Sequence, residues 1–279
     1  MNSMLKPTWL IHDYDTTEFN QLKAALKFTE TPYQEVIYKS SLDTLDKSNL
    51  PPLESCIVIH GSIQFVKALA NQGFVYTPGA YGFSKETDCS NYYPKIPKEC
   101  LLNYPYSLTT WAELKRSKEY FKKIFFNTSL FVRPNSGNKI FVGQNIYHYN
   151  WDENIKLIED TSSVRDETLI LVSNSKIIKP NEYRFAIIEK EVVTGSMYNW
   201  AKETSPEYPK ETEELAKIVA DQEWQLDGAY TCDIAFSPTG PKLIELNSFA
   251  AAGLYAMDKV KIVEAINKLA IKDYEEIYQ

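Results

Sequence analysis

Ala229-Tyr-Thr-Cys-Asp-Ile-Ala-Phe236 begins the most informative stretch of the sequence, which continues through Ser237-Pro-Thr-Gly240 to Pro241-Lys-Leu-Ile-Glu-Leu-Asn247. Two runs of β-forming residues flank a short turn that contains proline and glycine, and this pattern predicts a β-hairpin. Alternate positions of both runs are apolar, so one face of the hairpin is expected to pack into a core. The other face carries polar and acidic side chains.

The acidic side chains of this hairpin need a counter-charge. If Phe236 pairs with Lys242, Asp233 lies directly opposite Glu245, with Cβ atoms about 5 Å apart. Either one carboxyl group stays protonated, or a cation lies between the two. Asp233, Glu245 and the amide oxygen of Asn247 are suitable ligands for Mg²⁺, which usually shares its shell with substrate phosphates. The hairpin thus predicts a magnesium–nucleotide site, and the alternative is a solvated hairpin with two surface acids.

Length and composition set broad limits on the protein. The 279 residues favour two domains, and the hydrophobic (44%) and charged (24%) fractions are typical of a soluble globular protein. A formal net charge of −7 argues against general binding to nucleic acid or anionic membranes, so any phosphate site must be local. No apolar run has membrane-spanning length and no signal peptide is evident, which predicts a soluble cytoplasmic protein.

The cysteines and histidines are scattered along the chain and form no spaced motif. They are Cys56, Cys89, Cys100, Cys232, His12, His60 and His148. This distribution predicts reduced thiols and disfavours a zinc site or a histidine-based catalytic triad.

The first part of the chain predicts a small α/β domain. Strands are expected at 8–12, 33–38, 56–60 and 74–77, and helices at 16–28 and 63–71. Alternation of strands and helices favours a partly parallel sheet. Gly61-Ser62 falls where a strand turns into a helix, so it forms either an anion or substrate site at a helix N-terminus or a plain turn.

A change of composition between Pro78 and Pro105 suggests the domain boundary, because prolines and glycines interrupt any long element there. We therefore divide the chain into an N-terminal α/β domain, residues 1–88, and a second domain, residues 89–279. A helix is expected at 109–125, with Thr109 or Thr110 as its N-cap.

A second hairpin is expected at 130–143, where two apolar runs flank a loop that contains Ser136 and Gly137. Folded about this loop, Arg133 lies opposite Lys139, so two positive charges meet on one face. A polyanion would relieve their repulsion, and the loop offers backbone N–H groups to phosphates. The alternative is a solvated basic loop.

A third pair of strands is expected at 182–188 and 192–198, after a buried strand at 168–172. If the pair folds around Lys190, one face carries Glu182, Arg184, Ser196 and Tyr198. Glu182 is then suited to ribose hydroxyls and Arg184 to a phosphate or a substrate carboxylate, while a surface ion pair is the alternative.

Taken together, these pieces resemble the ATP-grasp superfamily. The resemblance covers about residues 105–260, and its most specific part is Glu245-Leu-Asn247 at a strand end with Asp233 on the preceding strand. It implies an α+β ATP-grasp fold, in which two α+β subdomains clasp a nucleotide, preceded by the small α/β domain. The superfamily normally has lysine where this chain has Arg133, which resembles a less characterised branch found in phages and bacteria.

The resemblance also implies roles for individual residues. Asp233, Glu245 and Asn247 are expected to hold Mg²⁺, Leu171 and Val172 to lie near the adenine of ATP, and Glu182 to lie near the ribose. The remaining nucleotide-binding residues are expected to be Arg133, Ser136, Gly137, Lys139 and Arg184. Three cations among them, Arg133, Lys139 and Arg184, are the expected catalytic residues.

The implied activity is that of an ATP-dependent carboxylate–amine ligase. A carboxylate attacks the γ-phosphate to form an acyl-phosphate, and an amine then displaces phosphate, which requires positioning and charge neutralisation more than a protein nucleophile. The expected partners are a small-molecule or peptide carboxylate and an amine. Alternatives are an ATP-dependent kinase and a nucleotide-binding protein without catalysis; the oligomeric state stays open. The small residues Ala250-Ala-Ala-Gly253 form either an acceptor pocket or a closely packed helix.

Overall fold

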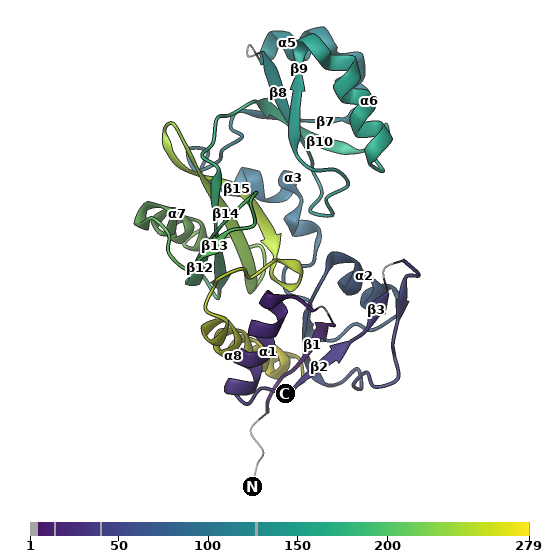
Figure 1. Ribbon diagram of the computed structural model, residues 1–279, viewed down its shortest axis with the longest axis vertical. Helices are drawn as coiled ribbons and strands as arrows, with labels where there is room; N and C mark the ends of the chain where they lie inside the picture. The colour runs from purple at the N-terminus through teal and green to yellow at the C-terminus, as the bar shows by residue number, and fades with distance from the viewer. Residues whose placement is uncertain (1–4, 14, 40, 126–127, 279) are drawn as a thin grey trace. The chain divides into compact units, whose positions relative to one another are not determined.

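The computed structural model describes residues 5–13, 15–39, 41–125 and 128–278 of the chain, and Figure 1 shows its helices and strands. The chain forms two compact units. Unit 1 comprises residues 1–84, 180–234 and 245–279, and unit 2 comprises residues 85–179 and 235–244. The division predicted after residue 88 concerns domains along the sequence rather than compact units, and it stays a prediction.

Unit 1 contains a four-stranded parallel sheet in the order β2-β1-β5-β6, as the sequence predicted. Its elements are β1 (Thr8–His12), α1 (Thr17–Phe28), β2 (Tyr33–Val36), β5 (Cys56–His60), α2 (Ile63–Asn71) and β6 (Thr77–Gly79). A short pair, β3 (Tyr38–Lys39) and β4 (Thr44–Leu45), lies between β2 and β5 in the chain. The strand expected at 74–77 is wrong over most of its length. Phe74 instead closes helix α2, because its N–H donates to the Leu69 carbonyl.

The second sheet of unit 1 has the order β13-β12-β11-β14-β15. Its strands are β11 (Asn181–Ile188), β12 (Glu191–Asn199), β13 (Thr204–Ser205), β14 (Ala229–Ser237) and β15 (Gly240–Ser248). Helix α7 (Lys210–Ala220) precedes β14, and the 3₁₀ turn η4 (Phe249–Ala251) follows β15. Both predicted hairpins of this region are therefore present.

The β11–β12 hairpin has the predicted register, with Glu182 opposite Tyr198 and Arg184 opposite Ser196. Its turn lacks glycine, yet Glu189 and Lys190 both adopt positive φ angles, 48° and 67°. Two successive positive φ values are what the tight turn of a twisted hairpin demands. Here two charged residues adopt them without glycine.

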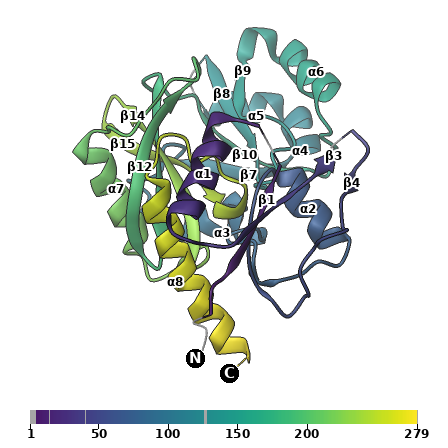
Figure 2. The same ribbon diagram turned by 60° about the horizontal axis from the view of Figure 1, so that its bottom comes forward.

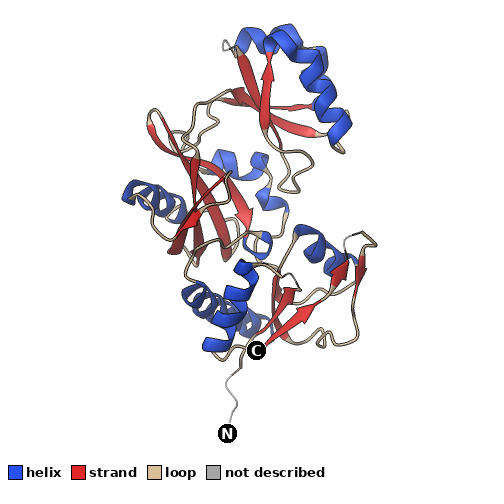
Figure 3. Ribbon diagram, viewed as in Figure 1, coloured by secondary structure: helices blue, strands red, loops and turns tan. Residues whose placement is uncertain are grey.

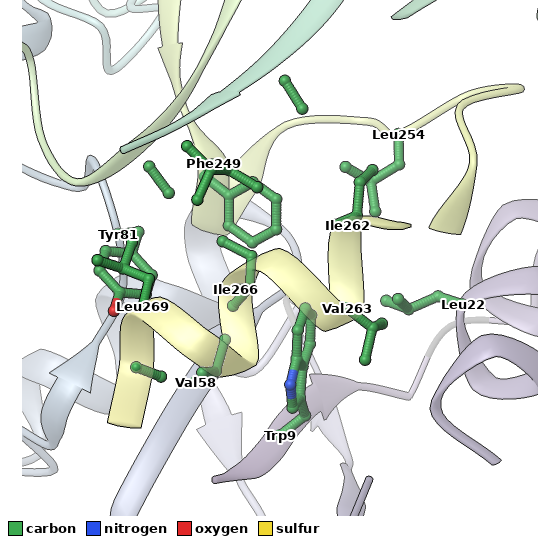
Figure 4. Packing of buried hydrophobic residues seen from close by; sticks show 14 of the residues in the cluster. Trp9, Leu22, Val58, Tyr81, Phe249, Leu254, Ile262, Val263, Ile266 and Leu269 are labelled. Carbon is green, nitrogen blue, oxygen red and sulfur yellow. The ribbon is translucent and has the colours of Figure 1, made fainter. Parts of the chain in front are cut away.

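The core of unit 1 forms around helix α8 (Lys259–Tyr278), which runs beside α1 (Figure 2). Its buried side chains recur at helical spacing and are Ile262, Val263, Ile266, Leu269 and Ala270. They pack against Trp9 of β1, Leu22 of α1 and Val58 of β5 (Figure 4). Phe249 and Leu254 join the same cluster, so the segment after β15 is fixed by the core.

Unit 2 contains an antiparallel sheet in the order β7-β10-β8-β9, with helices beside it (Figure 3). The strands are β7 (Tyr106–Thr110), β8 (Ser129–Pro134), β9 (Gln144–Tyr147) and β10 (Leu169–Asn174). The helical elements are η1 (Lys85–Thr87), α3 (Cys89–Tyr92), η2 (Tyr93–Lys95), α4 (Trp111–Arg116), α5 (Lys118–Ile124), η3 (His148–Asn150) and α6 (Trp151–Thr161). Side chains of α4, α5 and α6 form one core with β8 and β10.

Two expectations for unit 2 are wrong in detail. The helix expected at 109–125 is split into α4 and α5 at Ser117, and its first two residues belong to β7. The predicted N-cap is correct, because Thr110 Oγ1 accepts a hydrogen bond from the Glu113 N–H. The Ser117 hydroxyl donates to the Glu113 carboxylate at the break.

The second correction concerns the register of the hairpin at 130–143. The expected pairs Arg133–Lys139, Val132–Ile140 and Phe131–Phe141 are not formed, because Phe131 pairs with Asn145 and Val132 with Gln144. Residues 135–143 form a loop instead. Phe141 from this loop is buried in the core of unit 2, and its burial competes with a regular ladder.

No helix in the part of the chain that the structure describes is long and apolar enough to span a membrane. The four cysteines are all free thiols, and all are buried.

Candidate functional site

A buried ion pair lies at the centre of the five-stranded sheet of unit 1. Arg184 of β11 donates from Nε to Asp233 Oδ1 and from Nη2 to Asp233 Oδ2, each at 2.6 Å. Arg184 is 5% exposed and Asp233 of β14 is 0% exposed. Asp233 is therefore no surface acid, and the counter-charge that the sequence demanded is supplied here by Arg184. Such bidentate pairs are strong and geometrically specific.

Two tyrosine rings enclose the Arg184 guanidinium. Its central carbon lies 5.3 Å from the ring centre of Tyr198 and 5.0 Å from that of Tyr255. The two rings stack on one another with centres 4.4 Å apart. Arg184 Nη1 also donates to the Gly253 carbonyl at 3.2 Å. Cation–π contacts and this hydrogen bond hold the guanidinium in one position.

Further polar side chains extend the ion pair into a network. Asp233 Oδ2 accepts hydrogen bonds from Asn247 Nδ2 at 3.0 Å and from the Tyr198 hydroxyl at 3.1 Å. The same Tyr198 hydroxyl donates to Glu182. Burial, followed by the charge of Asp233, raises the pKa of Tyr198 above its ordinary value, so this tyrosine stays protonated. The predicted residues Glu182, Arg184, Asp233 and Asn247 thus come together in one network.

Glu245 lies close enough to this network to influence it electrostatically. Burial raises the pKa of the Glu182 carboxyl, and the nearby charges of Asp233 and Glu245 raise it further. The hydrogen bond from Tyr198 and the charge of Arg184 act in the opposite direction. Three carboxyl groups therefore lie near Arg184, an arrangement that suits an additional cation.

The donor set on β15 fits a magnesium ion. Glu245 and Asn247 are two residues apart on one strand, so they project from the same face, and both are half-buried. Asn247 donates through Nδ2, which makes its Oδ1 the amide atom suited to a metal. No group of three Asp, Glu, His or Cys side chains among the described residues is arranged to hold a metal ion. Mg²⁺ typically needs only one or two protein carboxylates when substrate phosphates complete its shell.

The predicted phosphate-binding residues lie in unit 2. Arg133 of β8 is half-buried and donates from Nη1 to the Ile244 carbonyl at 3.1 Å. Lys139 is exposed in the loop 135–143 and has a φ of 52°. Leu171 of β10 is the direct strand partner of Arg133, and Val172 is next to it; both are fully buried. The structure thus brings Arg133 beside the predicted adenine-binding strand.

The loop that contains Ser136 and Gly137 already binds a carboxylate. Burial raises the pKa of Asp88, while hydrogen bonds to this carboxyl from the Gly137 N–H and the Ser136 side chain lower it. Gly137 also packs tightly, since an added Cβ would lie 2.6 Å from Thr87 Oγ1. Donors that satisfy a carboxylate are of the kind that binds phosphate oxygens.

A cavity of about 670 Å³ adjoins the network within unit 1. Tyr198, Gly253 and Tyr255 contact Arg184 and also line this cavity. The sequence analysis did not single out Tyr255 or the cavity residue Glu18. Neither belongs to a recognisable motif, and only the position of Tyr255 shortly after Asn247 could have drawn attention to it.

The fold and the site define the class of protein. Residues 81–266 match a family model that describes an ATP-grasp domain, the third family of its clade. The match spans most of the chain, so the chain belongs to this family of ATP-grasp domains. Comparison with curated proteins found no match.

Solved structures with a similar fold cover nearly the whole chain. D-cycloserine synthetase DcsG is 9% identical with a TM-score of 0.61, covering 94% of this chain and 99% of its own. The D-alanine-D-alanine ligase from Coxiella burnetii is 11% identical with a TM-score of 0.62, covering 98% and 97%. ATP-grasp ligase PsnB, complexed with precursor peptide PsnA2 and AMPPNP, is 8% identical with a TM-score of 0.57, covering 97% and 99%. At such identities, the similarity establishes the fold alone.

Proposed function

We propose that this protein is an ATP-dependent ligase that joins a carboxylate to an amine through an acyl-phosphate. The observation that carries the proposal is the family match over residues 81–266. The similar structures support it, because their names describe a synthetase and ligases that include a D-alanine-D-alanine ligase and a peptide-bound ligase.

In this proposal, the cations of unit 2 bind the triphosphate of ATP. Arg133 and Lys139 contact phosphate oxygens, and the Ser136–Gly137 loop exchanges the Asp88 carboxylate for a phosphate oxygen. The β10 segment at Leu171 and Val172 lies against the adenine. Glu182 accepts hydrogen bonds from the ribose hydroxyls, a role for which its hydrogen bond with Tyr198 orients it.

Magnesium is proposed to bind Glu245 and Asn247 first. Asp233 belongs to the same set, although both its oxygens accept hydrogen bonds from Arg184, so it joins the metal only when one of those bonds is released. When bound, Mg²⁺ neutralises charge on the phosphate oxygens and orients them for transfer.

The proposed chemistry has two steps. A carboxylate oxygen of the substrate attacks the γ-phosphorus, the bond to the β–γ bridging oxygen breaks, and ADP leaves. The amine nitrogen then attacks the acyl carbon, the acyl–oxygen bond breaks, and phosphate leaves while the amine loses a proton to solvent. Arg133 and Lys139 offset negative charge on the transferred group.

Arg184 is proposed to stabilise the oxyanion of the second step or to hold the substrate carboxylate. A guanidinium carries five N–H donors, more than the contacts with Asp233 and Gly253 use. The rings of Tyr198 and Tyr255 keep the guanidinium in place, so it needs no reorganisation during the reaction.

The test is ADP release with pairs of carboxylates and amines, combined with mass spectrometry of the products. We expect an amide product, and we expect Glu245→Gln to reduce turnover by about 100-fold or more, because a metal ligand and its charge are lost. Glu191→Gln, at an exposed position of β12, is the matched control and should keep its activity.

A stable phosphate ester as the only product would replace the ligase with a kinase. Binding of AMPPNP without any turnover across the whole substrate panel would contradict catalysis. A Glu245→Gln variant with full activity would remove Glu245 from the proposed metal site.

A further inference from the structure

The cavity of about 670 Å³ in unit 1 has the size of a small-molecule site. Two segments singled out in the sequence meet in its wall. One is Gly61-Ser62 at the N-terminus of α2, and the other contains Ala251, Ala252 and Gly253 after β15. The open question about both segments, site or plain packing, is thereby narrowed, since both face one cavity.

Charges of both signs line the cavity. Glu18, in the first turn of α1, is half-buried, and its Oε1 accepts a hydrogen bond from the Leu254 N–H at 2.5 Å. Lys202, in the segment between β12 and β13, is exposed. A molecule with one positive and one negative group would complement both side chains.

The N-terminus of α2 adds partial positive charge. Ser62 is the N-cap, and the first turn of this nine-residue helix contains no acidic side chain to offset its dipole. The Ser62 hydroxyl accepts from the Phe65 N–H, so the hydroxyl is engaged in capping. The first N–H groups of a helix have no partners inside the helix and favour a carboxylate.

His60, which precedes this turn, supplies a second and independent indication of a ligand. It lines the cavity, is 2% exposed, and its Nδ1 has no hydrogen-bond partner among the residues that the structure describes. Burial lowers its pKa to about 4, although a backbone hydrogen bond with Phe249 partly opposes this shift. A neutral imidazole nitrogen accepts a hydrogen bond, and an N–H group of a ligand would satisfy it.

The rest of the lining is largely apolar. Phe19, Ala251, Ala252 and Tyr255 surround the space, and the small alanines leave room beside the aromatic rings. Tyr255 connects the cavity to Arg184, with which it makes a cation–π contact. An occupant therefore reaches the network in which the reaction is proposed to occur.

We propose that this cavity binds a zwitterionic amino compound, a free α-amino acid or a short peptide, with its ammonium group at Glu18 and His60 and its carboxylate at Lys202 and the N-terminus of α2. The inference rests on the proposed function and deepens it, because it names the substrate class of the ligase.

The test is calorimetric titration of the full chain with and without AMPPNP and Mg²⁺. The probes are L-alanine, D-alanine, L-leucine, L-phenylalanine and the dipeptide L-Ala-L-Ala, each with its N-acetyl and carboxamide derivative. At least one parent compound should bind, and blocking either charged group should weaken its binding at least tenfold. Tighter binding by the dipeptide identifies a peptide as the occupant, and tighter binding by a free compound identifies an amino acid.

Two variants assign the two ends of the ligand. Glu18→Gln keeps a carbonyl oxygen for the Leu254 N–H, so it should fold, and it should lose the discrimination against N-acetyl compounds. Lys202→Met should lose part of the discrimination against carboxamides. Glu264→Gln and Lys268→Met, at exposed positions of α8 outside the cavity lining, are the controls and should bind as the parent chain does.

The inference fails if blocked derivatives bind as tightly as their parents, or if none of the probes binds to a chain that still binds AMPPNP. Failure of the proposed function looks different, because AMPPNP would then not bind, whereas zwitterion binding without nucleotide would still support the cavity's role.

Discussion

Two arginines on strands of different sheets, Arg184 and Arg133, illustrate opposite uses of the same side chain. Arg184 is 5% exposed, and its guanidinium is held by Asp233, Gly253 and two tyrosine rings. Arg133 is half-buried and donates to a backbone carbonyl. A buried charge must be compensated by the fold, whereas a partly exposed one has solvent as an alternative partner.

The comparison separates stability from ligand binding. Arg184 is expected to matter for folding even without any ligand, because its loss would leave the Asp233 carboxylate buried. Arg133 and the exposed Lys139 are expected to matter chiefly when a phosphate is present. Three measurements test this contrast, and they follow from the largest expected effect to the smallest.

The largest effect is expected from Arg184→Met. Removal of one partner of a buried ion pair typically costs about 3–5 kcal/mol, and urea unfolding should show a loss of that order. The double variant with Asp233→Asn removes the stranded charge while it keeps an acceptor for Asn247 and Tyr198, so it should recover more than half of the loss. A loss below about 1 kcal/mol in the single variant would contradict the buried pair.

The second measurement concerns His60, a buried group that folding keeps uncharged. Burial lowers its pKa from 6.5 to about 4. As the pH falls below 6.5, the unfolded chain binds the proton first, so folding stability declines between pH 6.5 and 4. At pH 5, this group should account for a loss of about 2 kcal/mol relative to pH 7. His60→Gln should reduce the pH dependence of the unfolding free energy by that amount, and an unchanged slope would show that His60 is accessible to protons in the folded state.

The smallest effect is expected from Arg133→Met and Lys139→Met. Each should weaken AMPPNP binding about tenfold, equivalent to about 1.4 kcal/mol, while the unfolding free energy changes by less than about 1 kcal/mol. Lys123→Met, at an exposed position of α5, is the control. If Arg133→Met destabilised the chain as much as Arg184→Met, the contrast between the two arginines would not hold.

Much of the local structure followed from sequence patterns. Buried apolar runs predicted β1, β5 and β10, helical spacing predicted α1 and α2, and alternation predicted the register of β11 and β12. These patterns succeed because burial of one face is a local property of strands and helices. The break at Ser117 escaped prediction because no glycine or proline marks it.

The loop 135–143 shows where such patterns fail. Its register depends on the burial of Phe141 and on the contact of Gly137 with Thr87, about fifty positions earlier in the chain. A hairpin drawn from strand propensity alone placed Arg133 opposite Lys139 because it ignored both constraints.

The sequence by itself determined that Asp233 and Glu245 require a counter-charge, that Arg133 and Lys139 form a basic region, and that the chain resembles ATP-grasp proteins. Only the tertiary structure decided that Arg184 supplies the counter-charge at Asp233, and that Glu18, His60, Lys202 and Tyr255 share one cavity. The physical reason is that charge balance can be counted along a sequence, whereas the partner of a buried charge is selected by packing between segments far apart in the chain.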